Sequence, residues 1–475
     1  MRIRIDWVQR VIRSGVASLV SPVTTVAAAG VLLAVPFAWG DQARAPGKPN
    51  VVLIITDDAG YADTGCYGAR DIRTPHIDRL ASEGARLTHF YANGMSCTPT
   101  RAGLMAGRYQ QRYGIEFVLP SPGLPGSDRG LPPLAHSLPL LMKNNGYATA
   151  LIGKWHLGYT PAFSPSAHGF EYFFGFKSPA IDYFTHFSTR PSEGAQFASG
   201  QPDLWENETL INQEGYMTDL ITQKTVEFIN ANAGRPFFVQ VAFNAPHSPT
   251  QSPAAQASAS TQGSATRADY VAVMERVDRG VGEILEPLRT HSLEDETIVI
   301  FTNDNGGIGL SNSAPLFHRK FSAWEGGIRV PAIIRWPGRI PGGTVSEQVG
   351  ITMDLTTSIL ASTSTPVPPE ADLEGIDLFS LLKARSPVVD RTLFWRTGGP
   401  SPVNMNQKAV RRGDWKLIID GAVTRILLFN VKDDPSERED WFSRRPDLVR
   451  ELRQLLADWE QDVDADAKAF TATPR

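Results

Sequence analysis

The chain has 475 residues, too many for a single hydrophobic core, because such cores rarely grow beyond about 250–300 residues. We therefore expect a large domain and a smaller one. A formal net charge of −4 lacks the basic excess typical of nucleic-acid-binding proteins, and we expect no nucleic-acid partner.

The N-terminus has the layout of a secretory signal peptide. Several arginines precede an uncharged stretch from Ser14 to Gly40, which ends in small residues at the positions a signal peptidase reads. An uncleaved membrane anchor is the alternative, but Pro22 weakens a spanning helix, which needs about 20 apolar residues. Arg10 and Arg13 are not adjacent, so a twin-arginine signal is not evident. We expect residues 1–40 to be a signal peptide, and the mature protein to be periplasmic or secreted with no stable membrane association.

The first strand is predicted from Val51 to Ile55, a continuous apolar run typical of a strand buried on both faces of a parallel sheet. It leads into Asp57 and Asp58. Ligands bind at the carboxyl ends of strands in open α/β sheets, which favours a binding role for this pair. The alternative is that one aspartate caps a helix and the other is solvated.

A cysteine-containing segment follows a predicted helix and strand. The helix, Thr74 to Gly84, begins with a cap residue and a proline and ends at a glycine. The strand spans Gly84 to Tyr91. Next come Cys97-Thr98-Pro99-Thr100-Arg101, and a helix is predicted from Pro99. This helix carries Cys97 at or just before its N-terminus, where the helix dipole and free N–H groups favour an anion.

Cys97 is one of only two cysteines, and the other is Cys66. In an exported protein a disulfide between them is the alternative to a reactive Cys97. We favour the reactive Cys97, because its surrounding segment has the more specific explanation given below. Cys66 is then expected to be a small buried residue.

Further strands also end in polar residues. Ala148 to Ile152 is followed by Lys154 and His156, which would share one side of a strand-like continuation. Phe237 to Ala242 is another predicted strand, and His247 lies shortly after it.

The next buried strand, Thr297 to Thr302, runs into Asp304 and Asn305. Lys320 then lies ahead of the predicted strand Ala332 to Trp336. Polar groups thus follow four of the predicted strands.

Strands alternate with amphipathic helices predicted at about 216–232 and 270–288, which implies a mostly parallel sheet covered on both faces. After Pro366-Val367-Pro368-Pro369 the strands become shorter and the chain ends in one helix. We therefore predict an α/β fold: a large, mostly parallel, mixed sheet sandwiched by helices in residues 45–365, and a smaller C-terminal subdomain with an antiparallel sheet plus a helix in residues 366–475.

The acidic and amide residues predict a metal site. Asp57, Asp58, Asp304 and Asn305 offer only oxygen atoms, which suit a hard cation such as Ca²⁺, with Mg²⁺ as the alternative. Zinc would be expected to recruit histidine or cysteine. Arg101, one helical turn beyond the cysteine, can steady the carboxylates of the metal.

Taken in order, these motifs resemble the sulfatase family, and they span nearly all of the predicted mature chain. The matching segments are Asp57-Asp58, Cys97-Thr98-Pro99-Thr100-Arg101, Gly153-Lys154-Trp155-His156-Leu157-Gly158, Ala245-Pro246-His247, Asn303-Asp304-Asn305-Gly306, Trp324-Glu325-Gly326-Gly327-Ile328-Arg329-Val330-Pro331 and Gly413-Asp414-Trp415-Lys416-Leu417.

The resemblance implies a modified nucleophile. In that family a Cys-x-Pro-x-Arg segment directs oxidation of the cysteine to formylglycine, an aldehyde that hydrates to a geminal diol. Cys97 is then a precursor, a formylglycine-generating maturation enzyme is a partner, and a sulfate monoester of an aryl or carbohydrate group is the substrate. The metal would hold a sulfate oxygen and one hydroxyl of the modified Cys97.

The resemblance also implies roles for the cationic residues. Lys154, His247 and Lys320 would bind the sulfate oxygens, with His247 or Lys320 protonating the leaving oxygen. His156 would contact the diol and act as the base for sulfate release.

Two residues depart from the family pattern. Thr100 stands where serine is common in the motif, and His76 stands where asparagine is frequent.

Two alternative functions remain open. One alternative is a phosphonate monoester or phosphodiester hydrolase of the same superfamily. The other is a catalytically silent secreted binding protein in which Cys97 stays a thiol.

Overall fold

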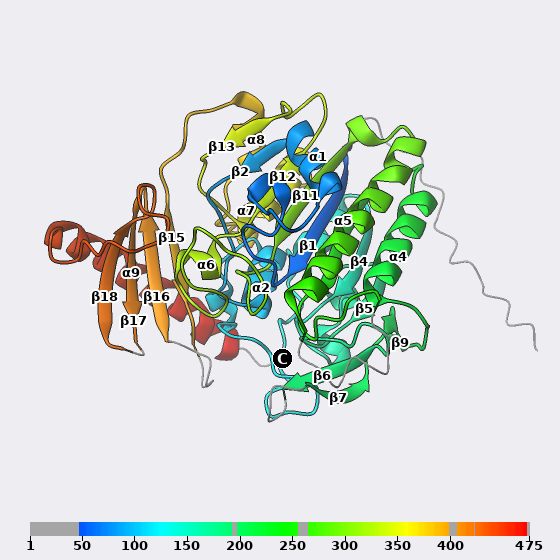
Figure 1. Cartoon of the computed structure of the whole chain (residues 1–475), viewed down its shortest axis with the longest axis horizontal. Helices are drawn as coiled ribbons and strands as arrows, with labels where there is room; N and C mark the ends of the chain where they lie inside the picture. Colours follow the sequence, from blue (N-terminus) through cyan, green and yellow to red (C-terminus); the bar gives the residue numbers. More distant parts are fainter. Residues whose placement is uncertain (1–46, 192–196, 255–264, 399–405, 422, 473–475) are drawn as a thin grey trace, which may run out of the picture. The chain divides into compact units, whose positions relative to one another are not determined.

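Four of the apolar segments predicted as buried strands form the centre of a ten-stranded mixed sheet (Figure 1). β1 (Asn50–Asp57) lies between β10 (Phe237–Pro246) and β11 (Thr297–Asn303) and runs parallel to both. β4 (Ala148–Lys154) pairs in parallel with β10. Every residue of these four strands is buried, which explains their predominantly apolar sequences.

The structure is a computed structural model, and it describes residues 47–191, 197–254, 265–398, 406–421 and 423–472. The predicted signal peptide, residues 1–40, lies outside the described residues. Among the helices within them, none is both long enough and apolar enough to cross a membrane.

Shorter strands extend the sheet at both edges. The edge next to β4 continues with β5 (Tyr172–Phe176), β8 (Trp205–Glu206) and β9 (Thr209–Leu210). The edge next to β11 continues with β12 (Ala332–Arg335), β2 (Ala85–Leu87) and β13 (Thr344–Ser346). The pairings of β12 with β11 and β2, and of β8 with β5 and β9, are antiparallel, so the sheet is mixed as predicted.

Helices cover both faces of the sheet. On one face lie α1 (Pro75–Glu83), α4 (Met217–Ala231) and α5 (Arg267–Thr290). On the other lie α2 (Cys97–Ala106), α3 (Leu138–Asn144), α7 (Thr352–Ser362) and α8 (Leu378–Ala384). Val51, Leu53 and Ile55 of β1 share one apolar core with residues of this second group, as expected for side chains that alternate across a strand.

The single strand predicted from Gly84 to Tyr91 is two strands. The chain leaves β2 at Leu87 and starts β3 (Phe90–Tyr91), which pairs with β14 (Gly350–Ile351) in a separate two-stranded sheet. Between them, the carbonyl oxygen of Thr88 accepts a hydrogen bond from Nε of Arg329 at 2.7 Å. The side chain of Arg329 thus occupies a backbone carbonyl oxygen that a continuous strand would have used for pairing.

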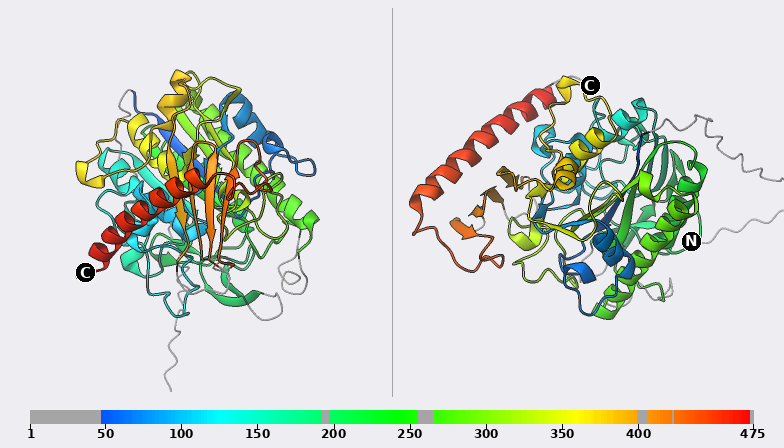
Figure 2. Two further views of the ribbon diagram at one scale, coloured as in Figure 1. Left: turned by 90° about the vertical axis from the view of Figure 1, so that its left-hand side faces the viewer. Right: turned by 90° about the horizontal axis from the view of Figure 1, so that it is seen from above.

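The C-terminal part forms the predicted antiparallel sheet with a helix. Its four strands are β15 (Thr392–Arg396), β16 (Gln407–Arg412), β17 (Trp415–Asp420) and β18 (Arg425–Asn430), and α9 (Pro446–Ala472) crosses them (Figure 2). Trp395 and Leu417 of this sheet share one core with Tyr91 and Ile328 of the preceding part. The two parts are therefore joined by a common apolar core.

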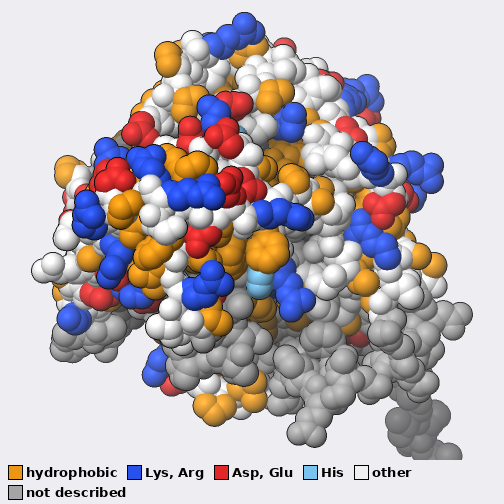
Figure 3. Space-filling model, turned by 60° about the vertical axis from the view of Figure 1, so that its left-hand side comes forward, with side chains coloured by type: hydrophobic (Ala, Val, Ile, Leu, Met, Phe, Trp, Pro, Cys, Tyr) orange, Lys and Arg blue, Asp and Glu red, His pale blue; other side chains and the backbone are white. Residues whose placement is uncertain are grey.

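Two smaller elements complete the description. β6 (Phe187–Pro191) and β7 (Phe197–Pro202) form an antiparallel pair, and α6 (Glu325–Ile328) is a single turn. On the face shown in Figure 3, positive and negative side chains lie interspersed, in keeping with the small net charge.

Candidate active site

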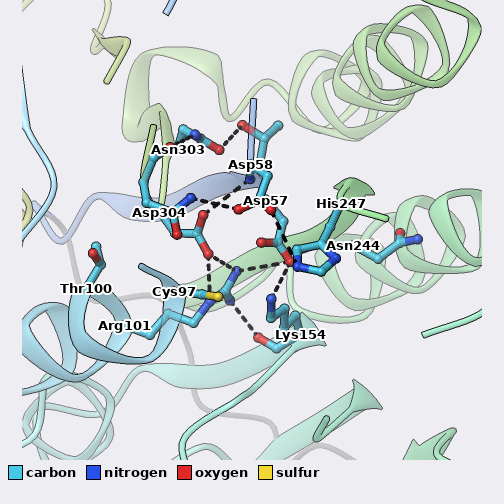
Figure 4. Close-up of polar contacts among 12 residues, drawn as sticks. Asp57, Asp58, Cys97, Thr100, Arg101, Lys154, Asn244, His247, Asn303 and Asp304 are labelled. Carbon is cyan, nitrogen blue, oxygen red and sulfur yellow. Dashed lines mark hydrogen bonds and ion pairs between the residues drawn. The ribbon is translucent and has the colours of Figure 1, made fainter. Parts of the chain in front are cut away.

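The polar residues predicted after separate strands come together at the carboxyl edge of the sheet (Figure 4). β1 ends in Asp57 and is followed by Asp58, while β11 is followed by Asp304. β4 ends at Lys154, and His247 directly follows β10. Parallel neighbouring strands end at the same edge, which is why residues distant in the sequence become neighbours here.

Cys97 is the first residue of α2 and is 1% exposed. The backbone before it is fixed by Thr100: its hydroxyl accepts a hydrogen bond from the backbone N–H of Gly94 at 3.0 Å and lies 3.2 Å from the carbonyl oxygens of Gly94 and Ser96. Threonine in place of serine therefore keeps a hydroxyl that holds the start of the helix.

Arg101 connects the cysteine helix to the acidic residues. Its Nε and Nη2 lie 3.1 and 2.9 Å from Oδ2 of Asp304, and Nη2 lies 4.0 Å from Oδ2 of Asp57. Its Nη1 donates to the carbonyl oxygen of Lys154 at 2.9 Å. The guanidinium group thus holds the carboxylate of Asp304, and it also fixes the end of β4.

Two lysines pair with the adjacent aspartates. Nζ of Lys154 lies 2.5 Å from Oδ2 of Asp57, and Nζ of Lys320 lies 2.6 Å from Oδ1 of Asp58. Nζ of Lys320 also lies 3.5 Å from Sγ of Cys97, and Nε2 of His247 lies 3.4 Å from Oδ2 of Asp58. Because all these groups except His247 are fully buried, the charges interact through a medium that screens them weakly.

Close backbone packing sets the position of Lys154. A Cβ atom on the preceding residue, Gly153, would lie 1.8 Å from the carbonyl oxygen of Ala242 in β10. Glycine at 153 therefore lets β4 approach β10 closely enough for Lys154 to reach Asp57.

The electrostatic environment shifts the pKa values of Asp57 and Asp58 in opposite directions. Burial and the neighbouring Asp304 raise the pKa of Asp57 to about 7, against the effect of Lys154. Burial also acts to raise the pKa of Asp58, but Lys320 and His247 outweigh it and hold that pKa well below the ordinary value. Burial raises the pKa of the Cys97 thiol, which favours the protonated thiol in the unmodified chain.

His156 is not part of a strand-like continuation, contrary to our prediction. Its φ of +57° turns the chain directly after β4, and Nε2 lies 3.1 Å from the carbonyl oxygen of Leu119. A carbonyl can only accept, so Nε2 carries the proton in the neutral ring and Nδ1 is left as a buried acceptor with no hydrogen-bond partner. Burial and the charge of Lys154 hold the pKa of His156 well below its ordinary value.

His247 is also held in one orientation. Its Nδ1 lies 2.7 Å from the carbonyl oxygen of Ser248, which leaves Nε2 facing Asp58. Burial lowers the pKa of His247 to about 4, although Asp58 acts to raise it.

Asn303 was not predicted to have a role, yet it joins two of the polar loops. Its Oδ1 accepts from the hydroxyl of Thr56 at 3.0 Å and from the backbone N–H of Ala59 at 3.3 Å. Its Nδ2 donates to the carbonyl oxygens of Ala59 and Asn305. The available signal was its place at the end of a buried strand, directly before Asp304.

Two observations fit a hard cation among these residues. Oδ1 of Asp57 and Oδ1 of Asn305 are buried and have no hydrogen-bond partner, and both are oxygen atoms of the predicted ligand set. One potential ligand atom from each of Asp57, Asp304 and Cys97 lies within 4.8 Å of the other two. Buried polar atoms are normally satisfied, so two unpaired oxygens in this position fit the ligand set of a hard cation.

The two cysteines are not bonded to each other. Cys66 is only partly buried, contrary to our expectation, because it lies in a short 3₁₀ turn, Gly65–Tyr67. The disulfide alternative is therefore not supported.

Comparisons with known proteins agree with this arrangement. The sulfatase family model matches residues 49–365, and a model for the C-terminal part of N-sulphoglucosamine sulphohydrolase matches residues 315–462. N-acetylgalactosamine-6-sulfatase of Mus musculus is 35% identical over 470 residues, which cover 87% of this chain and 88% of that protein. Arylsulfatase G of Homo sapiens is 30% identical over 474 residues, with 88% of each protein covered.

Solved structures show the same relationship. The structure of Ps i-CgsB in complex with k-i-k-neocarrahexaose matches with a TM-score of 0.78 and 29% identity, covering 90% of this chain and 98% of that one. With the family model spanning most of the chain, the chain belongs to the sulfatase family and is a sulfuric ester hydrolase.

Proposed function

We propose that this enzyme hydrolyses a sulfate monoester carried by a sugar, and that its nucleophile is a formylglycine hydrate made from Cys97. The observation that carries the proposal is the position of Cys97, buried at a helix N-terminus between the ammonium group of Lys320 and the acidic cluster. A helix N-terminus favours anions, and Lys320 adds a positive charge within reach of the same atom. This setting suits a nucleophile that must approach a sulfate group.

The hydrated aldehyde would supply one hydroxyl that attacks sulfur and displaces the alcohol by cleavage of the ester S–O bond. The second hydroxyl would then lose its proton, which re-forms the aldehyde and releases sulfate by C–O cleavage, and addition of water restores the hydrate. Lys154 and Lys320 would bind the sulfate oxygens, as their buried ammonium groups lie next to Asp57 and Asp58 respectively. His247 or Lys320 would give a proton to the leaving oxygen, and Lys320 is the better candidate, because its pKa is raised whereas that of His247 is lowered to about 4. The unpaired Nδ1 of His156 would take the proton of the second hydroxyl.

Asp57, Asp58, Asp304 and Asn305 would hold a divalent metal, for which we propose Ca²⁺ with Mg²⁺ as the alternative. The metal would draw negative charge from a sulfate oxygen and from a hydroxyl of the modified Cys97. Three buried carboxylates already face three buried cations, Arg101, Lys154 and Lys320. A divalent cation that enters together with a singly charged sulfate ester shifts the net charge of this cluster by only one unit, less than the cation would alone.

Two of the similar proteins favour a sugar sulfate over an aryl sulfate. One is N-acetylgalactosamine-6-sulfatase, and the other is the structure in complex with a neocarrahexaose, whereas arylsulfatase G carries the name of the aryl class. We therefore propose a sulfated carbohydrate as the physiological substrate. We also propose that the protein is exported and is matured by a formylglycine-generating enzyme before it works.

The closest alternative is a phosphonate monoester or phosphodiester hydrolase. The test compares turnover of a nitrophenyl sulfate with turnover of a nitrophenyl phosphonate, followed by a panel of sulfated monosaccharides. We expect the sulfate to be hydrolysed faster and a sugar sulfate to have the highest kcat/KM. Faster cleavage of the phosphonate would overturn the proposal, and protein that shows no turnover and keeps Cys97 as a thiol after exposure to a formylglycine-generating enzyme would favour a silent binding protein.

A further inference from the structure

Phe117 and Phe321 form a partly exposed aromatic pair beside the candidate active site. Their ring centroids lie 5.7 Å apart with an angle of 32° between the planes, and both side chains are only partly buried. The two rings come from segments more than 200 residues apart in the sequence. Partly exposed aromatic pairs next to a charged site are a common feature of ligand-binding surfaces.

Phe321 is tied to the nucleophile segment from one side. It follows Lys320 directly, and Nζ of Lys320 lies 5.2 Å from the centroid of the Phe321 ring and 3.5 Å from Sγ of Cys97. The backbone N–H of Phe321 donates to the carbonyl oxygen of Met95 at 2.8 Å. The ring therefore has a defined position relative to the attacking group.

Phe117 is tied to the same segment from the other side. Two residues beyond it, the backbone N–H of Leu119 donates to Oγ1 of Thr98 at 3.1 Å, and the carbonyl oxygen of Leu119 lies 3.1 Å from Nε2 of His156. The two rings thus belong to two segments whose backbones are hydrogen-bonded to Met95 and Thr98, which flank Cys97 in the sequence.

The backbone at Phe321 is held in an unusual conformation. Its φ is +71°, a left-handed value that bulky residues rarely adopt. Such strain persists only where the surroundings fix the residue, and it is concentrated at functional sites. Here the fixed conformation keeps an aromatic ring next to Lys320.

We propose that Phe117 and Phe321 form the wall of the subsite that binds the group esterified to the sulfate, and that this group is a sugar ring lying on them with its apolar face. The inference rests on the proposed function. The rings contact each other, so nothing flat enters between them, and they offer a surface to one face of a ligand. The C–H face of a sugar packs on such a surface, and its hydroxyl groups remain free for polar partners.

The test replaces each ring by leucine, which keeps an apolar side chain but removes the flat face. For Phe117→Leu and Phe321→Leu we expect KM for the best sugar sulfate of the panel to rise about 3- to 10-fold, as expected for loss of one aromatic contact, with kcat changed less than about 3-fold. The inhibition constant of inorganic sulfate, which lacks the sugar, is expected to stay at the wild-type value.

Phe317→Leu is the matched control. Phe317 lies in the same loop, is 45% exposed, and packs on Trp324 with ring centroids 4.9 Å apart, outside the pair. We expect wild-type KM for this variant. Phe117→Tyr and Phe321→Tyr keep an aromatic ring and are expected to have the wild-type KM. The formylglycine content of every variant is measured by mass spectrometry. If a leucine variant does not fold, the other position and the tyrosine variants still decide the result.

The outcomes separate the two proposals. Unchanged KM in both leucine variants, or the same rise in Phe317→Leu, would overturn the aromatic subsite and leave the sulfatase function standing. A rise in KM for nitrophenyl sulfate without a rise for the sugar sulfate would overturn the sugar as occupant. No turnover of any sulfate ester by wild-type protein that contains formylglycine would instead overturn the proposed function itself.

Discussion

The ammonium group of Lys320 lies 3.5 Å from the sulfur atom of Cys97. The same group pairs with Asp58 at 2.6 Å, and this carboxylate holds the pKa of Lys320 well above its ordinary value despite burial. Lys320 therefore keeps its positive charge beside the atom that becomes the nucleophile. The charge can both attract the sulfate group and stabilise negative charge that develops on the leaving side.

Replacing Lys320 by methionine is expected to lower kcat/KM for a sulfate ester by about 10²- to 10³-fold, because one positioned charge is lost in a buried site. Arg319→Met is the control, since Arg319 is adjacent in sequence but exposed, and it should retain activity within about 2-fold. Steady-state kinetics on protein with matched formylglycine content measures the effect. Equal activity of the two variants would contradict the role of Lys320.

Metal binding is expected to stabilise the folded protein. Adding Ca²⁺ to chelator-treated protein should raise Tm, and a ligand at 100 times its Kd contributes about 2.7 kcal/mol. In Asp304→Asn the rise should be lost or strongly reduced, whereas Glu214→Gln, which changes an exposed acid, should respond like the wild type. Calorimetric titration and thermal unfolding give the readout without activity. An undiminished rise in Asp304→Asn would remove Asp304 from the metal site.

Lys416 joins the C-terminal sheet to the segment that carries Lys320, and its loss should destabilise the folded protein. Its Nζ lies 2.9 Å from Oε1 of Glu325 and 2.8 Å from Oε1 of Glu437, and all three side chains are fully buried. Lys416→Met leaves two buried carboxylates without this partner and should lower the free energy of unfolding by about 3–5 kcal/mol.

The control for this change is Lys408→Met, because Lys408 lies in the same sheet but its side chain is 38% exposed. Its pairing with Glu460 should be worth at most about 1 kcal/mol. Chemical denaturation measures both variants. Comparable losses of stability in the two variants would show that burial does not make the Lys416 ion pairs stronger than the exposed pair of Lys408.

The same cluster predicts a dependence of stability on pH. Burial and the charge of Glu325 raise the pKa of Glu437 from its ordinary 4.5 to about 7, against the effect of Lys416. Burial acts to raise the pKa of Glu325 as well, but Lys416 and Arg329 prevail and lower it to about 2. Glu437 therefore contributes stability that is full below pH 4.5 and is lost as the pH rises through 7. The contribution of Glu325 is present above pH 4.5 and is lost as the pH falls through 2.

The variant Glu437→Gln cannot lose a proton at this position, so its stability no longer falls as the pH rises through 7. The free energy of unfolding of the variant relative to the wild type should therefore increase between pH 5 and pH 8, by about 1 kcal/mol or more. Denaturation at several pH values tests this. A difference between variant and wild type that does not change with pH would contradict the raised pKa of Glu437.

The centre of the fold could be predicted because its strands are apolar on both faces. β1, β4, β10 and β11 are predominantly apolar, and such runs indicate buried parallel strands without any knowledge of their partners. The β8 and β9 strands, Trp205–Glu206 and Thr209–Leu210, were not predicted. They have two residues each and lie at an edge, so they carry no periodic pattern.

The composition of the candidate site could be predicted, but part of its geometry could not. The side chains at the strand ends followed from the topology of a parallel sheet. The orientation of His156 depends on a left-handed backbone conformation and on the carbonyl oxygen of Leu119, a backbone atom that every residue possesses. Neither leaves a signal in the sequence. The same holds for the pairing of Phe117 with Phe321, which depends on loops that meet only in the folded chain.

The central claim is that Cys97 must be converted to formylglycine before the enzyme works. Mass spectrometry of the peptide that contains Cys97, on preparations made with and without a formylglycine-generating enzyme, gives the fraction converted. Sulfate release is then measured on the same preparations. Turnover should be proportional to the converted fraction and absent from protein that retains the thiol. Full turnover by protein whose Cys97 is an unmodified thiol would contradict the account.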